Sequence, residues 1–184
     1  MEETGFNYAQ ARAFAGQYGL IVGVLWIVSF GCAMYAFDFP LLGHVGNLFA
    51  LLSLFAEVWL LRQFQHEIVP LGGMRRWWMA WTISMYAALL TSFAQFLYFR
   101  FIDGGHLLAS FRSMAEQVEY EEMMQSLMPG TDFKTILEEF SAMPVGALMV
   151  NFIAFNFFVA LVFSVISALF SAVRLPYPDE SHDD

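Results

Sequence analysis

Four long apolar runs dominate the pattern of hydrophobic and polar residues along the chain. They cover Tyr18–Phe37, Pro40–Leu61, Trp77–Phe99 and Gly146–Ala172. Together these runs hold 92 residues, of which Glu57 is the only charged one. A helix of about 20 apolar residues crosses a bilayer core about 30 Å thick, because it rises about 1.5 Å per residue. The pattern therefore predicts four transmembrane helices.

The predicted fold is all-α, an integral membrane four-helix bundle. None of the runs alternates polar and apolar residues at every second position, as the strands of a membrane β-barrel do. Within hydrocarbon, a helix also satisfies its own backbone amides. The fourth run has 27 residues, so we expect its helix to tilt or to extend into an aqueous phase.

Composition and charge agree with a membrane protein. The 184 residues are 59% hydrophobic and 14% charged, whereas soluble domains average about 45–50% and about 25%. These values argue against a soluble enzyme and against a disordered protein. The net charge of −9 comes mainly from the connection 100–145 and the tail 173–184. Surfaces this acidic argue against a nucleic-acid partner.

The distribution of basic residues predicts the orientation. With four spans, segment 1–17, loop 62–76 and tail 173–184 share one side of the membrane, and connection 100–145 lies on the other. The first side carries Arg12, Arg62, Arg75, Arg76 and Arg174, whereas the second carries Arg100, Arg112 and Lys134 among eight acidic residues. Basic residues near span ends mark the cytoplasmic side. We therefore predict cytoplasmic termini and an extracytoplasmic 100–145 segment.

Segment 106–143 is predicted to form an extramembrane amphipathic helical pair. Apolar residues recur at helical spacing, first as Leu107, Phe111, Met114 and Val118 and then as Phe133, Ile136, Leu137 and Phe140. Pro129-Gly130 separates the two groups, and Thr131 or Asp132 is a candidate N-cap for the second helix. The apolar faces could pack on the ends of the spans, lie on the membrane or hold a partner.

Small residues on the first span form a helix-packing motif. Gly19, Gly23 and Gly31 lie at multiples of four residues, and Gly19–Gly23 is a GxxxG sequence. Such a motif lets two helix backbones approach closely. The partner helix could belong to a second copy of the chain, giving a homo-oligomer, or to another span of the same chain.

Spans three and four each carry a polar face. These faces consist of Ser84, Ala88, Thr91 and Gln95 on span three and Asn156, Ala160, Ser164, Ser167 and Ser171 on span four. Such side chains form hydrogen bonds between helices, each worth about 0.6 kcal/mol. They could instead line a path for a substrate or a lipid headgroup.

Glu57 is the one ionisable residue inside an apolar run. Such a residue is a functional-site hypothesis by default, as a proton relay or a substrate contact. Glu57 lies four residues before the end of its run at Leu61. We therefore expect it to reach the membrane interface and form an ion pair with Arg62, Arg75 or Arg76.

The sequence shows no arrangement typical of an enzyme. It lacks HExxH, GxSxG and P-loop motifs, and its histidines are predicted on two sides of the membrane. Met123, Met124 and Met128 are better explained as flexible packing residues than as a soft-metal site. Cys32 is a single cysteine, so no disulfide or CxxC site is expected. No catalytic residue, metal or cofactor is predicted.

Several short motifs are similar to those of a known family. They include Tyr18–Gly23, Gly72-Gly73, Phe99–Asp103 and Ser164–Phe170 above Arg174. With them the chain resembles the bacterial four-span inner-membrane family catalogued as domain of unknown function 4199. The resemblance implies a multi-pass protein of the bacterial inner (plasma) membrane and supplies no activity. The family usually has proline after the aspartate, where this chain has Gly104, so the start of the outer helix stays open.

These observations favour a non-enzymatic structural or accessory subunit of a membrane assembly. Its partners would be the lipid bilayer and either a second copy or another membrane protein. The alternative is a small transporter or lipid-handling protein that uses Glu57 and the polar faces of spans three and four.

Overall fold

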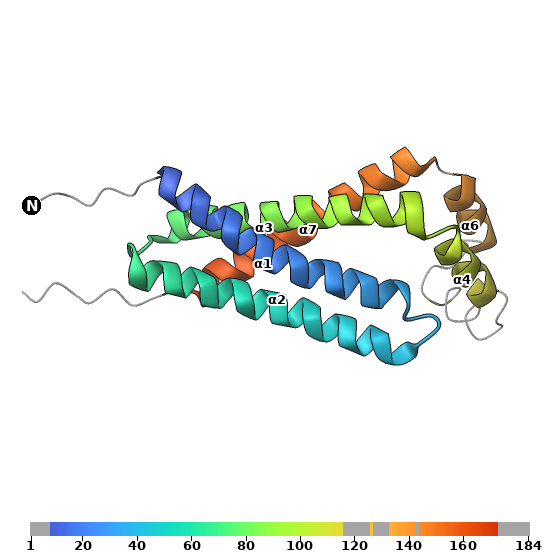
Figure 1. Cartoon of the computed structure of the whole chain (residues 1–184), viewed down its shortest axis with the longest axis horizontal. Helices are drawn as coiled ribbons and strands as arrows, with labels where there is room; N and C mark the ends of the chain where they lie inside the picture. The colour runs from blue at the N-terminus through green and yellow to red at the C-terminus, as the bar shows by residue number, and fades with distance from the viewer. Residues whose placement is uncertain (1–7, 116–125, 127–132, 143, 173–184) are drawn as a thin grey trace, which may run out of the picture.

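Four long helices run side by side and form the body of the protein (Figure 1). They are α1 (Tyr8–Met34), α2 (Pro40–Glu67), α3 (Gly73–Leu97) and α7 (Val145–Phe170). A π-helical turn (Tyr98–Ile102) continues α3, and two short helices follow, α4 (His106–Ala115) and α6 (Phe133–Ala142). The structure is a computed structural model and describes residues 8–115, 126, 133–142 and 144–172.

The four long helices confirm the predicted number of spans. Each is long and apolar enough to cross a membrane, over Tyr8–Met34, Pro40–Glu67, Gly73–Ile102 and Met149–Phe170. All described secondary structure is helical. The chain is therefore an all-helical, multi-pass membrane protein.

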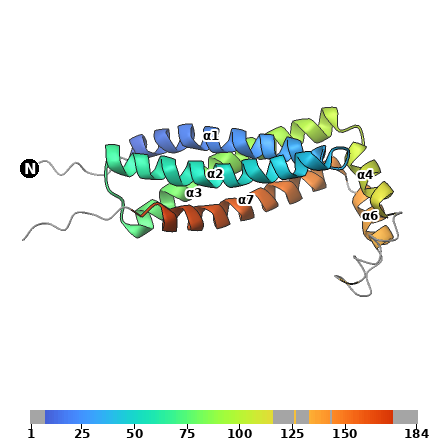
Figure 2. The same cartoon turned by 90° about the horizontal axis from the view of Figure 1, so that it is seen from below.

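The helices place the described chain ends together. Tyr8, the loop between α2 and α3, and the end of α7 lie at one end of the bundle, which we call the loop end (Figures 1 and 2). The tight turn between α1 and α2 lies at the opposite end with α4 and α6, and we call this the cap end. This arrangement agrees with the connectivity expected for four spans.

Two helices extend well beyond the apolar runs. α1 begins at Tyr8, so residues 8–17 of the predicted N-terminal segment are helical. Its added turns bury Ala11 and Ala15, and the Phe14 ring packs edge-on against Phe64 at 5.5 Å between centroids. α2 continues to Glu67, six residues past the predicted end. Tertiary packing stabilises these turns. The predicted bounds were drawn from the apolar runs alone, so they did not include these turns.

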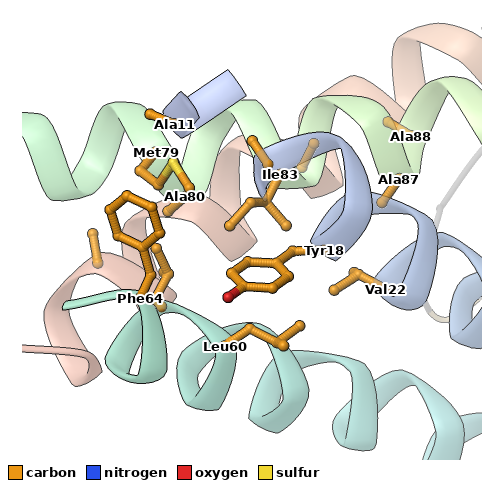
Figure 3. Close-up of a cluster of buried hydrophobic side chains, with 14 of the residues drawn as sticks. Ala11, Tyr18, Val22, Leu60, Phe64, Met79, Ala80, Ile83, Ala87 and Ala88 are labelled. Carbon is orange, nitrogen blue, oxygen red and sulfur yellow. The ribbon is translucent and has the colours of Figure 1, made fainter. Parts of the chain in front are cut away.

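The core lies mainly toward the loop end, between α1, α2 and α3 (Figure 3). Its largest side chains include Tyr18, Phe64, Met79 and Ile83. The Tyr18 hydroxyl points toward α2, near Leu60 and Phe64 (Figure 3). α3 occupies the centre of the arrangement, since it packs against α1 on one side and α7 on the other.

The end of α7 is held by side chains from α2 and α3. Arg62 and Gln65 of α2 donate to the carbonyl oxygens of Phe170 and Ser171 at 2.7 and 2.9 Å. Arg76 of α3 donates to the Ala168 carbonyl at 2.6 Å. The last carbonyls of a helix lack partners within it and carry partial negative charge, so cationic donors stabilise them. These bonds join α2 to α7 at the loop end.

The GxxxG sequence packs against α3 of the same chain. A Cβ atom added at Gly19 would lie 2.5 Å from Tyr86 Cβ and 2.9 Å from the Ile83 carbonyl oxygen. One added at Gly23 would lie 3.2 Å from Ala87 Cα. Among the described residues, nothing lies within 4 Å of a Cβ added at Gly31. Gly31 therefore does not share the intramolecular contact that Gly19 and Gly23 make.

The start of α4 is fixed by Asp103 and the two glycines after it. The Asp103 carboxylate accepts hydrogen bonds from the backbone N–H groups of Gly105 and Leu107 at 3.0 and 3.1 Å. Gly104 and Gly105 have φ angles of +55° and +88°, which glycine adopts without steric cost. The chain thus turns sharply into the helix that begins at His106.

α4 and α6 lie next to each other beyond the cap end of α3 and α7 (Figures 1 and 2). Leu107 is buried, but the side chains of Phe111, Met114, Leu137 and Phe140 lie outside the described part of the structure. The amphipathic packing of the pair therefore stays a prediction. Val118, Met123, Met124, Met128, Thr131, Asp132 and tail 173–184 also lie outside the described residues.

Substitution of Gly19 by alanine should destabilise the bundle. The added methyl would overlap α3 backbone and Cβ atoms, and overpacking of this kind costs about 1–3 kcal/mol. Gly31→Ala is the matched control, because open space surrounds Gly31 within the described chain. Unfolding of purified protein in mixed micelles measures both. Equal stability of Gly19→Ala and Gly31→Ala would contradict the α1–α3 contact.

Candidate functional site

The Glu57 side chain is completely buried between helices (0% exposed). It lies on α2 ten residues before the end of that helix at Glu67, not near the end of a span. The expected interfacial ion pair with Arg62, Arg75 or Arg76 is wrong, because Glu57 Oε1 bonds to Ser84 and Glu57 Oε2 is buried without a partner. Arg62 and Arg76 instead bind the carbonyl oxygens at the end of α7.

Hydroxyl groups from two other helices face the Glu57 carboxyl group. Ser84 Oγ of α3 donates a hydrogen bond to Glu57 Oε1 at 2.9 Å. Ser167 of α7 lies beside the same carboxyl group, but its hydroxyl makes no hydrogen bond of good geometry there. Glu57 Oε2 is buried without a hydrogen-bond partner. Glu57, Ser84 and Ser167 together form what we call the acidic centre.

The acidic centre is electrostatically unusual, because Glu57 makes no ion pair with any described residue. A charged side chain near the middle of a membrane helix costs about 2.5–3.5 kcal/mol on insertion scales. Buried charges are normally paired with an opposite charge or bound to a metal. Uncharged hydroxyls surround this carboxyl group instead, so a negative charge on it has little compensation.

A second polar contact lies one helical turn along α2. Trp26 Nε1 of α1 donates to Ser53 Oγ at 3.0 Å, and this hydroxyl donates to the Ala50 carbonyl at 2.6 Å. Ser53 and Glu57 are four residues apart and share a face of α2. This face therefore meets α1 through Ser53 and meets α3 and α7 through Glu57.

The polar faces of α3 and α7 pack against each other inside the bundle. Every residue of both predicted faces is buried. Asn156 Nδ2 donates to Ser92 Oγ at 2.8 Å and to Gln95 Oε1 at 2.7 Å. We call the polar members the polar seam; they are Ser84, Thr91, Ser92 and Gln95 of α3 and Asn156, Ser164, Ser167 and Ser171 of α7.

The polar seam contains both satisfied and unsatisfied groups. The Asn156 cluster is hydrogen-bonded across helices, and Ser164 donates to the Leu161 carbonyl of its own helix at 2.7 Å. The hydroxyls of Thr91, Ser167 and Ser171 are buried without a partner. Buried polar groups are nearly always hydrogen-bonded, and the exceptions often mark functional positions or bound water. Asn156 therefore joins helices, whereas Thr91, Ser167 and Ser171 have spare hydrogen-bonding capacity.

Several residues of this region were not predicted from the sequence. Ser92 is adjacent to Thr91 but was not part of the expected face, and Ser53 and Trp26 gave no periodic signal. Gly46 was also missed; a Cβ there would lie 3.0 Å from the Ser29 carbonyl oxygen of α1. The described residues contain no group of three or more His, Cys, Asp or Glu side chains that could hold a metal ion.

Comparison with known proteins gives one match. The family model described as "Protein of unknown function (DUF4199)" matches residues 17–172. No curated protein and no solved structure matches the chain.

Removal of the Asn156 amide should weaken the α3–α7 contact. Asn156→Ala deletes two interhelical hydrogen bonds and leaves the buried oxygens of Ser92 and Gln95 without this donor. We therefore expect a loss of about 1–2 kcal/mol in the free energy of unfolding. Asn151→Ala, at an exposed position on the same helix, should have little effect. A double-mutant cycle with Gln95→Ala isolates the pair, and a coupling energy near zero would argue against this bond.

Proposed function

The chain belongs to the DUF4199 family of proteins of unknown function, and we propose that it is a non-enzymatic accessory or structural subunit of a membrane assembly. The proposal rests on the helix surface that the bundle leaves uncovered. In the most apolar stretch of α2, only 17% of the residues are buried, compared with 39% in α3.

The uncovered surface of α2 has a regular pattern. Leu48, Leu52, Phe55 and Trp59 recur at four, three and four residues and are 48–69% exposed. This spacing is that of a helix-packing seam. α2 lies at the edge of the bundle with α1 on one side and meets α7 through its loop end (Figure 2). A transmembrane helix of another subunit, or of a second copy, fits this surface; lipid is the competing occupant.

Photo-crosslinking distinguishes these occupants. A photoreactive residue at Phe55 or Trp59, in protein expressed at native level, should give a protein adduct larger than the monomer. The same residue at Phe93, exposed on α3, is the matched control. Mass spectrometry identifies the adduct. Adducts of lipid alone at Phe55 and Trp59 would overturn the accessory role.

A second candidate is a small transporter or lipid-handling protein. The acidic centre favours it, because an uncompensated carboxyl group inside a membrane protein usually serves ions, protons or a substrate. The polar seam supports it too, since Asn156 to Ser171 corresponds to about 23 Å along α7 at about 1.5 Å per residue. In this role the polar side chains would bind the transported substrate or lipid, and the α2 surface would contact only lipid.

We place the protein in the bacterial inner membrane with both termini in the cytoplasm. The excess of arginines at the loop end supports this orientation, because Arg62, Arg75 and Arg76 all lie there. A reporter active only outside the cytoplasm should be active when fused at Glu121 and inactive at Asp184. The reverse activities would show the opposite orientation.

A further inference from the structure

We propose that Glu57 is a proton-binding site, loaded and unloaded through Ser167 and Ser171 from the loop end of the bundle. The carboxylate takes a proton that originates in water at this end and returns it by the same route. No other bond is made or broken. This assignment goes beyond the accessory role and does not depend on it.

The groups around Glu57 leave its charge without a counterion. α3 presents Ser84 and α7 presents Ser167, both uncharged. On α1, the buried titratable residue facing α2 is Tyr18, whose hydroxyl points toward Leu60 and Phe64 (Figure 3). At the loop end, Arg62 and Arg76 both donate to carbonyls of α7, and neither they nor Arg75 is paired with Glu57. A proton is thus the simplest means of neutralising the carboxyl group.

The geometry favours a proton over a metal ion. Hard cations require several oxygen ligands, six or more for Ca²⁺ and Mg²⁺. The acidic centre offers the two carboxyl oxygens of Glu57 and the hydroxyls of Ser84 and Ser167. Backbone carbonyls there are engaged in continuous helices, whereas ion sites in transporters use carbonyls freed by unwound segments. A proton bound to Glu57 Oε2 requires no such set of oxygen ligands.

The unpartnered hydroxyls mark a route to the loop end. Ser167 faces Glu57, and Ser171 lies four residues further along α7, about 6 Å at about 1.5 Å per residue, a separation that a proton crosses through one bridging water molecule from the loop end. Both hydroxyls are buried and make no hydrogen bond, so each is available to accept and donate a proton. Ser171 is the C-cap residue that follows the last residue of α7, Phe170, and Gln65 donates to its carbonyl. Toward the cap end on α7, Ser164 is already engaged with its own helix and Ala160 follows. The third unpartnered hydroxyl, that of Thr91, lies seven residues beyond Ser84 on α3, about 10 Å away at about 1.5 Å per residue, so the loop-end hydroxyls of α7 are the nearer ones along their helix.

Infrared difference spectroscopy of the full chain in lipid nanodiscs tests the binding step. Lowering the pH from mildly alkaline to mildly acidic should produce a carbonyl-stretch band of a buried protonated carboxyl group. The band should be lost in Glu57→Gln and retained in Glu67→Gln, which removes an exposed carboxyl group on the same helix. A band independent of pH, or no band assignable to Glu57, would overturn the proposal.

Two further measurements keep the test decisive if Glu57→Gln fails to fold. Ser84→Ala retains the carboxyl group but removes its hydrogen-bond donor, so the pH-dependent band should persist at a shifted frequency. Exchange of sodium for choline at constant pH should leave the band unchanged. A band that sodium suppresses would show that a metal cation, not a proton alone, occupies the acidic centre.

The route is tested by the rate of hydrogen–deuterium exchange of the same band. Ser171→Ala should slow exchange several-fold. Ser92→Ala, which alters the polar seam at the Asn156 cluster, should leave the rate unchanged. Equal rates in wild type and Ser171→Ala, or slower exchange only in Ser92→Ala, would overturn the loop-end route.

Discussion

Polar groups inside a membrane-spanning bundle must find their partners within the protein, and the contact between α3 and α7 depends on this constraint. The Asn156 amide bonds to Ser92 and Gln95 at one end of the polar seam. At the other end, Ser84 binds the Glu57 carboxyl group and thereby brings α2 to the same line of contact. Hydrocarbon offers no competing hydrogen bonds, so these few side chains specify which helix faces meet.

A second constraint brings α1 against α3. No polar bond is required there, because Gly19 and Gly23 let the two backbones approach and gain dispersion contact directly. α3 is thus held on one side by small residues and on the other by hydrogen bonds. α2 is bound mainly through α1 and through the arginine and glutamine donors at the end of α7. Its outer apolar face stays free for lipid or for another helix.

The acidic centre differs from the rest of the bundle, because polar groups in and near it are buried without hydrogen-bond partners. Ser84, Ser92, Gln95 and Asn156 form hydrogen bonds across helices. Glu57 Oε2 and the hydroxyls of Thr91, Ser167 and Ser171 are buried without a hydrogen-bond partner. Glu57, Ser167 and Ser171 lie on the half of the bundle that also carries the arginines and the chain ends, whereas Thr91 lies toward the cap end, beside the Asn156 cluster. Stability alone gives no reason to keep a carboxyl group there, because an apolar residue of similar size would avoid the desolvation penalty.

The sequence alone determined the class of the protein, the number of spans and the polar faces of two of them. It also identified Glu57 as a candidate functional residue. Each of these follows from composition or from helical periodicity, which are local properties of the chain. Only the tertiary structure decided where the helices end, because the added turns of α1 and α2 are stabilised by Ala11, Ala15 and Phe64 in contacts between segments far apart in sequence. The same reason applies to Glu57. Its distance from the end of an apolar run suggested the interface, but its burial depends on α3 and α7 covering it, and no local pattern records that contact.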